Sequence, residues 1–246
     1  MKTKKIISAG PLVLEAIYPR GSAHDSPRQR ARKRKLSSEA QQRMNRKYSF
    51  QKLELLLAAN FVPGDWIVCL TYGKDSLPKD RAQAVGRLKE FRRQLAKRRK
   101  TAGRQLLMVW NTENVFDHGR WHHHCVINAC GEDFALLREL WPWGEDIEIQ
   151  VLRIDKEHTY EAVARYMTKE ARERPNLRSW SYTRTCRQPE VESFPVPDDT
   201  TLQPPKGAQI YEDERKQNGY GSFRVVKYLA PNWRRALRRP PRRRKR

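Results

Sequence analysis

The sequence predicts an α+β fold with a split βαβ arrangement, in which an antiparallel sheet carries helices on one face. Two observations lead to this fold class. Between residues 66 and 154 the expected elements follow the order strand, helix, strand, strand, helix, strand. Apolar residues alternate in the strands but recur every three or four residues in the helices. In this arrangement the third strand lies inside the sheet, and the face opposite the helices stays open for a functional site.

The first half of the patterned region contains two expected helices and one strand. Residues 38–60 have the composition of a helix that opens the domain. Residues 66–72 (WIVCLTY) are β-branched and aromatic, which is typical of a strand. A second helix is expected from Asp80, a residue suited to cap it. Its apolar residues recur at helical spacing, at Ala82, Val85, Leu88, Phe91 and Leu95.

The second half continues the same alternation of elements. Residues 105–113 and 121–129 are expected to form the second and third strands, joined by a turn. Residues 132–141 are expected to form a short helix, and residues 146–154 a fourth strand, because isoleucine and valine alternate with other residues there. The segment 156–174 is strongly helical, and we expect this closing helix to lie near the open face of the sheet.

Basic runs and a proline-rich segment flank the patterned region. Blocks of like charge repel each other and usually stay disordered until a phosphate backbone neutralises them. An apolar stretch near the C-terminus could add a further strand to an edge of the sheet. We therefore divide the chain into a basic N-terminal arm (1–45), the patterned domain (46–186), a Pro-rich linker (187–207), an extra strand packing on the domain (208–230) and a basic disordered tail (231–246).

The charge of the chain indicates its class of partner. Among 246 residues, 51 lysines and arginines exceed 28 aspartates and glutamates, which gives a formal net charge of +23. An excess this large repels itself and is typical of a protein that binds a polyanion, with nucleic acid as the first candidate. No run of about 18 apolar residues is present, which argues against a membrane span. The N-terminus lacks a convincing signal-cleavage site, and the four cysteines form no CxxC pair, so we expect a cytoplasmic protein without a disulfide framework.

Three consecutive histidines lie on the third expected strand, in the segment GRWHHHCVIN. Side chains of a strand alternate between the two faces of its sheet, so His122 and His124 project together from one face. His123 and Cys125 project from the other face, where the helices are expected to pack. Two imidazoles separated by one residue can share a metal ion. The alternative is a polar strand end with a chance run of histidines.

An acidic residue, Glu113, ends the preceding strand. If these two strands form a hairpin, Glu113 lies near His122 across it. A carboxylate and two imidazoles are mixed oxygen and nitrogen ligands, which we expect to suit Mn²⁺ or Mg²⁺. A zinc site through Cys125 and Cys130 is the alternative, but Cys125 has the opposite strand parity from the two outer histidines.

A candidate nucleophile and a candidate cation lie on the closing helix. Tyr166 and Lys169 are three residues apart, so their side chains share a helix face. A tyrosine hydroxyl is a weak nucleophile unless its target is polarised or its phenolate is stabilised, and a nearby ammonium group can provide the stabilisation. Tyr160 is a rival nucleophile on a different face of this helix, and the residue three positions after it is Val163 rather than a lysine.

The order of these motifs resembles that of the single-tyrosine HUH endonucleases, in particular the rolling-circle replication initiators of bacterial plasmids, phages and integrated elements. The resemblance covers about residues 66–172. The family's first motif, a hydrophobic strand ending in threonine, is matched by VCLTY at 68–72. Its paired metal-binding histidines correspond to His122 and His124, with His123 at a position that usually carries a bulky hydrophobic residue. The acidic ligand, the nucleophile and its lysine correspond to Glu113, Tyr166 and Lys169.

This resemblance implies a ferredoxin- or RRM-like fold and a metal-dependent nickase that acts on single-stranded DNA at a replication origin. Tyr166 would attack the scissile phosphate and form a 5′-phosphotyrosyl intermediate, with Mn²⁺ or Mg²⁺ as the Lewis acid. The chain carries no P-loop motif, so a host helicase would unwind the duplex. The alternatives are an HUH transposase or relaxase with the same residues, or a non-catalytic nucleic-acid-binding protein of the RRM type. The oligomeric state is not predicted.

Overall fold

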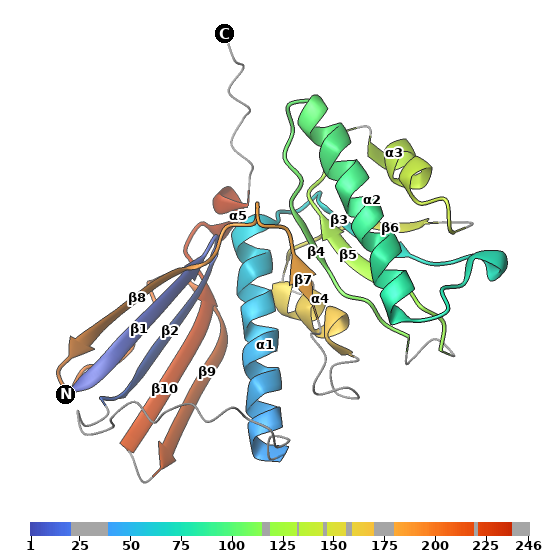
Figure 1. The fold of residues 1–246 in the computed structure, drawn as a ribbon. Helices are drawn as coiled ribbons and strands as arrows, with labels where there is room; N and C mark the ends of the chain where they lie inside the picture. Colours follow the sequence, from blue (N-terminus) through green and yellow to red (C-terminus); the bar gives the residue numbers. More distant parts are fainter. Residues whose placement is uncertain are drawn as a thin grey trace. The chain divides into compact units, whose positions relative to one another are not determined.

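The computed structural model describes residues 1–20, 39–114, 119–131, 133–144, 147–155, 159–169, 180–218 and 221–237. The chain forms two compact units. The first unit is Asn45–Arg187, and the second unit combines Met1–Met44 with Gln188–Arg246. Each contains one five-stranded antiparallel sheet (Figure 1). None of the described helices has the length and apolar character needed to cross a membrane. The basic runs at 28–35 and 238–246 lie outside the described residues.

The sheet of the first unit has the predicted split βαβ topology. Its strands lie in the spatial order β6, β3, β5, β4, β7, and every neighbouring pair is antiparallel. The strand with the histidines, β5, therefore lies inside the sheet, as predicted, while β7 is a short addition beside β4. The strands are β3 (Trp66–Leu70), β4 (Met108–Trp110), β5 (His123–Ile127), β6 (Ile147–Val151) and β7 (Ser181–Tyr182).

Two helices, α2 (Arg81–Thr101) and α3 (Asp133–Leu140), cover one face of this sheet, and a short 3-10 helix, η1 (Lys74–Ser76), precedes α2 (Figure 1). Asp80 caps α2 as predicted, because its carboxylate accepts a hydrogen bond from the backbone N–H of Gln83. Fully burying one large apolar side chain contributes about 1.5–3 kcal/mol. The apolar stripe of α2 shares one core with the central strands, which includes Val68, Leu70, Leu88, Phe91, Leu95, Cys125 and Ile127.

The opposite face of the sheet carries α4 (Tyr160–Met167), where Tyr166 contacts a histidine of β5. The longer helix α1 (Glu39–Asn60) lies against α4. The guanidinium carbon of Arg165 on α4 is 5.5 Å from the ring centroid of Phe50 on α1. The sequence KLELLLAAN gives the second half of α1 its buried leucines. α1 and α4 therefore cover part of the face that the sequence leaves open, and the closing helix lies where it was expected.

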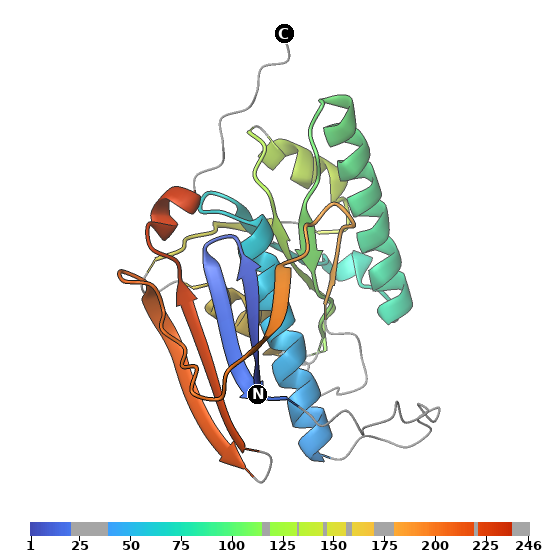
Figure 2. The ribbon, with the colours of Figure 1, turned by 90° about the vertical axis from the view of Figure 1, so that its left-hand side faces the viewer.

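The second unit differs from the sequence prediction of an arm and a linker. Its sheet has the order β8, β1, β2, β10, β9, with all pairs antiparallel, and Figure 2 shows the blue β1 and β2 between orange β8 and the red strands. β10 agrees with the predicted extra strand, but it pairs with β2 and β9 rather than with the first sheet. The elements are β1 (Lys2–Ala9), β2 (Leu12–Pro19), β8 (Glu190–Val196), β9 (Gln209–Asn218), β10 (Gly221–Leu229) and the short helix α5 (Trp233–Ala236).

The physical reason for this difference is the length of chain between paired strands. β1 and β2 form a local hairpin that turns at Gly10, whose φ of 57° lies in the region that favours glycine. The next partner of β1 is β8, where Lys2 pairs with Val196. Pairing across that separation leaves no local pattern, so an apolar N-terminal patch and a proline-rich segment did not reveal a shared sheet.

Candidate functional site

A narrow hairpin brings the acidic residue and the histidines together. Beyond the regular ends of β4 and β5, Glu113 and His122 form an isolated antiparallel bridge with two backbone hydrogen bonds of 3.0 Å. Residues that face each other across such a bridge project from the same face of a sheet. The hairpin expected from the sequence is therefore present, and it places Glu113 opposite His122.

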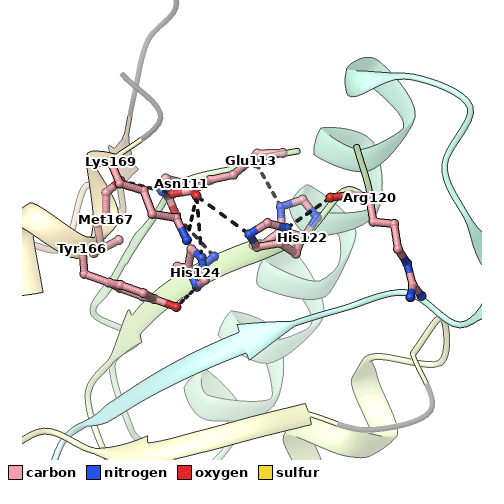
Figure 3. A network of polar contacts seen from close by, with 10 residues as sticks. Asn111, Glu113, Arg120, His122, His124, Tyr166, Met167 and Lys169 are labelled. Atoms are coloured by element: carbon pink, nitrogen blue, oxygen red, sulfur yellow. Dashed lines mark hydrogen bonds and ion pairs between the residues drawn. The ribbon is translucent and has the colours of Figure 1, made fainter. Parts of the chain in front are cut away.

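Glu113, His122 and His124 form one compact group (Figure 3). Their potential ligand atoms all lie within 4.8 Å of one another. Nε2 of His122 is 3.8 Å from Oε2 of Glu113, and Nε2 of His124 is 3.7 Å from the same oxygen. All three residues are buried, at 1%, 5% and 3% exposure. Three donor atoms therefore converge in a pocket of low dielectric.

The surroundings of His124 keep its ring neutral. Burial, the neighbouring His122 and the ammonium of Lys169 lower the pKa of His124 to about 3. Its Nε2 is buried and has no hydrogen-bond partner among the described residues. A buried polar nitrogen that binds nothing is costly. The group therefore fits a divalent cation held by two imidazole nitrogens and one carboxylate oxygen.

The middle histidine has a different environment. His123 points to the helix-covered face, where its Nε2 is 2.7 Å from the hydroxyl of Tyr72 and its Nδ1 is 2.9 Å from the hydroxyl of Thr112. Burial lowers the pKa of His123 to about 3, so its ring is a neutral part of the core. Cys125 follows on the same face and is fully buried in that core. The alternative zinc site through Cys125 would need this side chain on the other face of the sheet.

Tyr166 and Lys169 reach the buried group from the end of α4. The Tyr166 hydroxyl is 3.1 Å from Nδ1 of His124, and Nζ of Lys169 is 3.5 Å from Oε2 of Glu113. The same ammonium is 4.9 Å from the centroid of the Tyr166 ring. The structure thus brings together all five residues that the sequence singled out (Figure 3). Tyr166 is 45% exposed, so a substrate can reach it.

The two tyrosines of α4 have different surroundings. Partial burial raises the pKa of Tyr166 to about 12, with smaller contributions from nearby thiol and carboxylate groups. Its hydroxyl is therefore protonated at neutral pH. Tyr160 is 2% exposed, and its hydroxyl donates a 2.6 Å hydrogen bond to the backbone carbonyl of Phe61, just after α1. Tyr160 thus anchors α4 to α1, which removes it as a rival nucleophile.

Asn111, which the sequence analysis missed, joins the two halves of the site (Figure 3). Its Nδ2 donates hydrogen bonds to Oε1 of Glu113 and to the carbonyl oxygen of Met167 at the end of α4. Its Oδ1 accepts a hydrogen bond of 3.3 Å from the backbone N–H of His124. The available sequence signal is its position two residues before Glu113 on an expected strand, which puts both side chains on one face. Polar residues at strand ends are too common for this position to identify a functional role.

The region that contains this site is similar to a known family. Residues 65–171 match the ORF2-type family of replication-associated proteins. The matched segment contains all five predicted site residues and Asn111. No curated protein and no solved structure matches the chain. The similarity to replication-associated proteins implies an interaction with DNA.

Proposed function

We propose that this protein is a replication initiator that nicks and religates single-stranded DNA at an origin, through a covalent 5′-phosphotyrosyl intermediate. The observation that carries the proposal is the 3.1 Å contact between the Tyr166 hydroxyl and His124, a member of the buried group suited to a cation. The match of residues 65–171 to a replication-associated family supports it. The proposed enzyme is a metal-dependent endonuclease and strand transferase, with Mn²⁺ or Mg²⁺ as its cofactor.

Three residues would hold the cation, Glu113 through its carboxylate and His122 and His124 through imidazole nitrogens. When bound, a divalent cation supplies Lewis-acid polarisation of the scissile phosphate and orients it. Asn111 keeps the carboxylate of Glu113 in place, because its amide donates to Oε1. The low pKa of His124 keeps a nitrogen lone pair available throughout the neutral range.

Tyr166 is the proposed nucleophile. Its phenolic oxygen attacks the phosphorus, a new O–P bond forms, and the bond from phosphorus to the 3′ oxygen of the preceding nucleotide breaks. The phenolic proton passes to water, and the leaving 3′ oxygen takes a proton from water. The products are a 5′-phosphotyrosyl DNA end and a free 3′-hydroxyl that can prime synthesis. Attack by a 3′-hydroxyl in the reverse direction releases Tyr166 and religates the strand.

Two groups of this chain favour the phenolate form of Tyr166. With Nε2 of His124 acting as an acceptor toward the cation, the proton of the ring is on Nδ1, which then donates to the phenolic oxygen. The ammonium of Lys169 lies 4.9 Å from the ring and adds electrostatic stabilisation. Both contributions oppose the burial that raises the pKa of Tyr166 to about 12.

The remaining parts of the proposal concern partners and location. The net charge of +23 supports sequence-independent contacts with the DNA backbone, and such binding weakens steeply as the salt concentration rises. Opening a duplex lies outside the chemistry of the site, so we include a host helicase as a partner. Replication of an element inside a host cell also requires a cytoplasmic location.

The test is a cleavage assay with the full chain, Mn²⁺ and labelled single-stranded DNA from the intergenic region of the encoding element. Wild-type protein should form a covalent adduct on denaturing gels, and Tyr166→Phe or EDTA should abolish it. Tyr48→Phe is the matched control, because Tyr48 is 52% exposed on α1, and it should retain the adduct. An adduct that survives Tyr166→Phe would reject this nucleophile. DNA binding without an adduct on every substrate would instead favour a non-catalytic binding protein.

A further inference from the structure

A groove on the face of the first sheet that carries the site extends beyond Tyr166 and His124. Its volume is about 550 Å³, and its lining comes from β3, β5, β6, α4 and the chain between β6 and α4. His124 is the one member of the proposed cation group among its lining residues. We call this cavity the β6 groove, and the lining residues that matter below are Ile67, Glu148, Gln150, Arg153 and Val163.

Strand register places a carboxylate in the β6 groove. Cys69 of β3 pairs with His124 of β5 on one side and with Glu148 of β6 on the other. Paired residues share a face, and neighbouring strands are about 4.8 Å apart, so Glu148 lies about 10 Å across the sheet from His124. Its Oε1 accepts a 2.6 Å hydrogen bond from Nε2 of Gln150. The two side chains therefore present an acceptor and an amide at one place in the groove.

A carboxylate repels the phosphates of DNA, so Glu148 is unsuited to the backbone of the strand. It is suited to base edges, because it accepts hydrogen bonds from the exocyclic amino groups of cytosine, adenine and guanine. Thymine has no such group and presents carbonyl oxygens instead. Ile67 and Val163 line the same groove, and the neighbouring Val151 is 51% exposed, which gives the flat face of a base an apolar surface.

We propose that the β6 groove binds one nucleobase of single-stranded DNA next to the scissile phosphate, and that Glu148 selects bases with an exocyclic amino group over thymine. Arg153 is the cation in the groove that can meet the phosphate of the same nucleotide. The inference rests on the proposed function for its ligand. Base selection of this kind requires neither the metal nor attack by Tyr166.

The test measures the binding of the full chain to labelled oligonucleotides of cytosine or thymine by fluorescence anisotropy. Each oligonucleotide has about eight nucleotides, within the usual footprint of single-strand binding. EDTA prevents cleavage, and the salt concentration is fixed. Glu148→Gln removes one negative charge and should tighten binding to both oligonucleotides, so the readout is the ratio of the two affinities. Wild type should favour cytosine, and Glu148→Gln should reduce that preference about tenfold.

Glu139→Gln is the matched control for the loss of charge. Glu139 is 58% exposed on α3, which covers the other face of the sheet, and this variant should keep the wild-type ratio. An unchanged ratio in Glu148→Gln, or an equal change in Glu139→Gln, would overturn the inference. The adduct assay separates this inference from the proposed function. An adduct with an unchanged ratio removes base selection alone, whereas a changed ratio without any adduct removes the nickase and leaves the base site.

Discussion

Asn111 allows a direct test of how the site is held together. Asn111→Ala removes hydrogen bonds to the Glu113 carboxylate, to the Met167 carbonyl and from the His124 N–H. Such bonds contribute about 0.5–1.5 kcal/mol with neutral partners and about 1.5–3 kcal/mol with charged ones. We therefore expect the variant to lose about 3 kcal/mol of unfolding free energy. It should also release the carboxylate of Glu113 from its fixed orientation.

The decisive measurement is the affinity for Mn²⁺, obtained by isothermal titration calorimetry. Removing a group that orients a metal ligand usually costs about 10–100-fold in metal affinity, and we expect a loss of that size for Asn111→Ala. Asn60→Ala is the matched control, because Asn60 bonds backbone groups of Leu56 and Arg187 at the end of α1. It should lose about 1 kcal/mol of unfolding free energy in urea and keep the wild-type Mn²⁺ affinity.

Two results would refute this reasoning. One is a folded Asn111→Ala variant that binds Mn²⁺ as tightly as wild type, since Glu113 would then need no orienting partner. The other is an equal loss of Mn²⁺ affinity in Asn60→Ala. In that case the metal affinity would follow the overall stability of the first unit rather than the contact between Asn111 and Glu113.

The charges in and beneath the site can be tested in three other ways. Lys169→Met removes the ammonium 3.5 Å from Glu113, so the single-turnover cleavage rate should fall about tenfold, and an unchanged rate would exclude Lys169 from the mechanism. Because burial raises the pKa of Tyr166 to about 12, the phenolate fraction grows tenfold per pH unit below that value. The logarithm of the cleavage rate should therefore rise with a slope near one between about pH 6 and pH 9, and a flat profile would contradict this. Burial also lowers the pKa of His123 to about 3, so its contribution to stability is present above the unfolded value of about 6.5 and is lost as the pH falls toward 3. Between pH 7 and pH 5, wild type should lose about 2 kcal/mol more unfolding free energy in urea than His123→Leu, and equal losses would contradict the assignment.

Features that depend on the periodicity of one segment could be predicted from the sequence. The shared face of His122 and His124 follows from strand alternation, and the position of Glu113 follows from a single hairpin. Features that depend on contacts between distant segments could not. Asn111 matters because α4 ends beside it, and Glu148 matters because two strand registers carry it to the face of the site. No local pattern in either segment contains that information.

His124 is the residue at which the two parts of the proposed chemistry meet. Its Nε2 faces Glu113, and its Nδ1 faces the hydroxyl of Tyr166. The backbone of His124 is held on both sides, by pairing with Cys69 and by the hydrogen bond from the N–H of Asn111 to its carbonyl oxygen. A displacement of the ring toward one partner would take it away from the other. A central strand limits such displacement better than a loop does. Ligation of a cation and orientation of the nucleophile would therefore depend on one ring, held in place by the middle of the sheet.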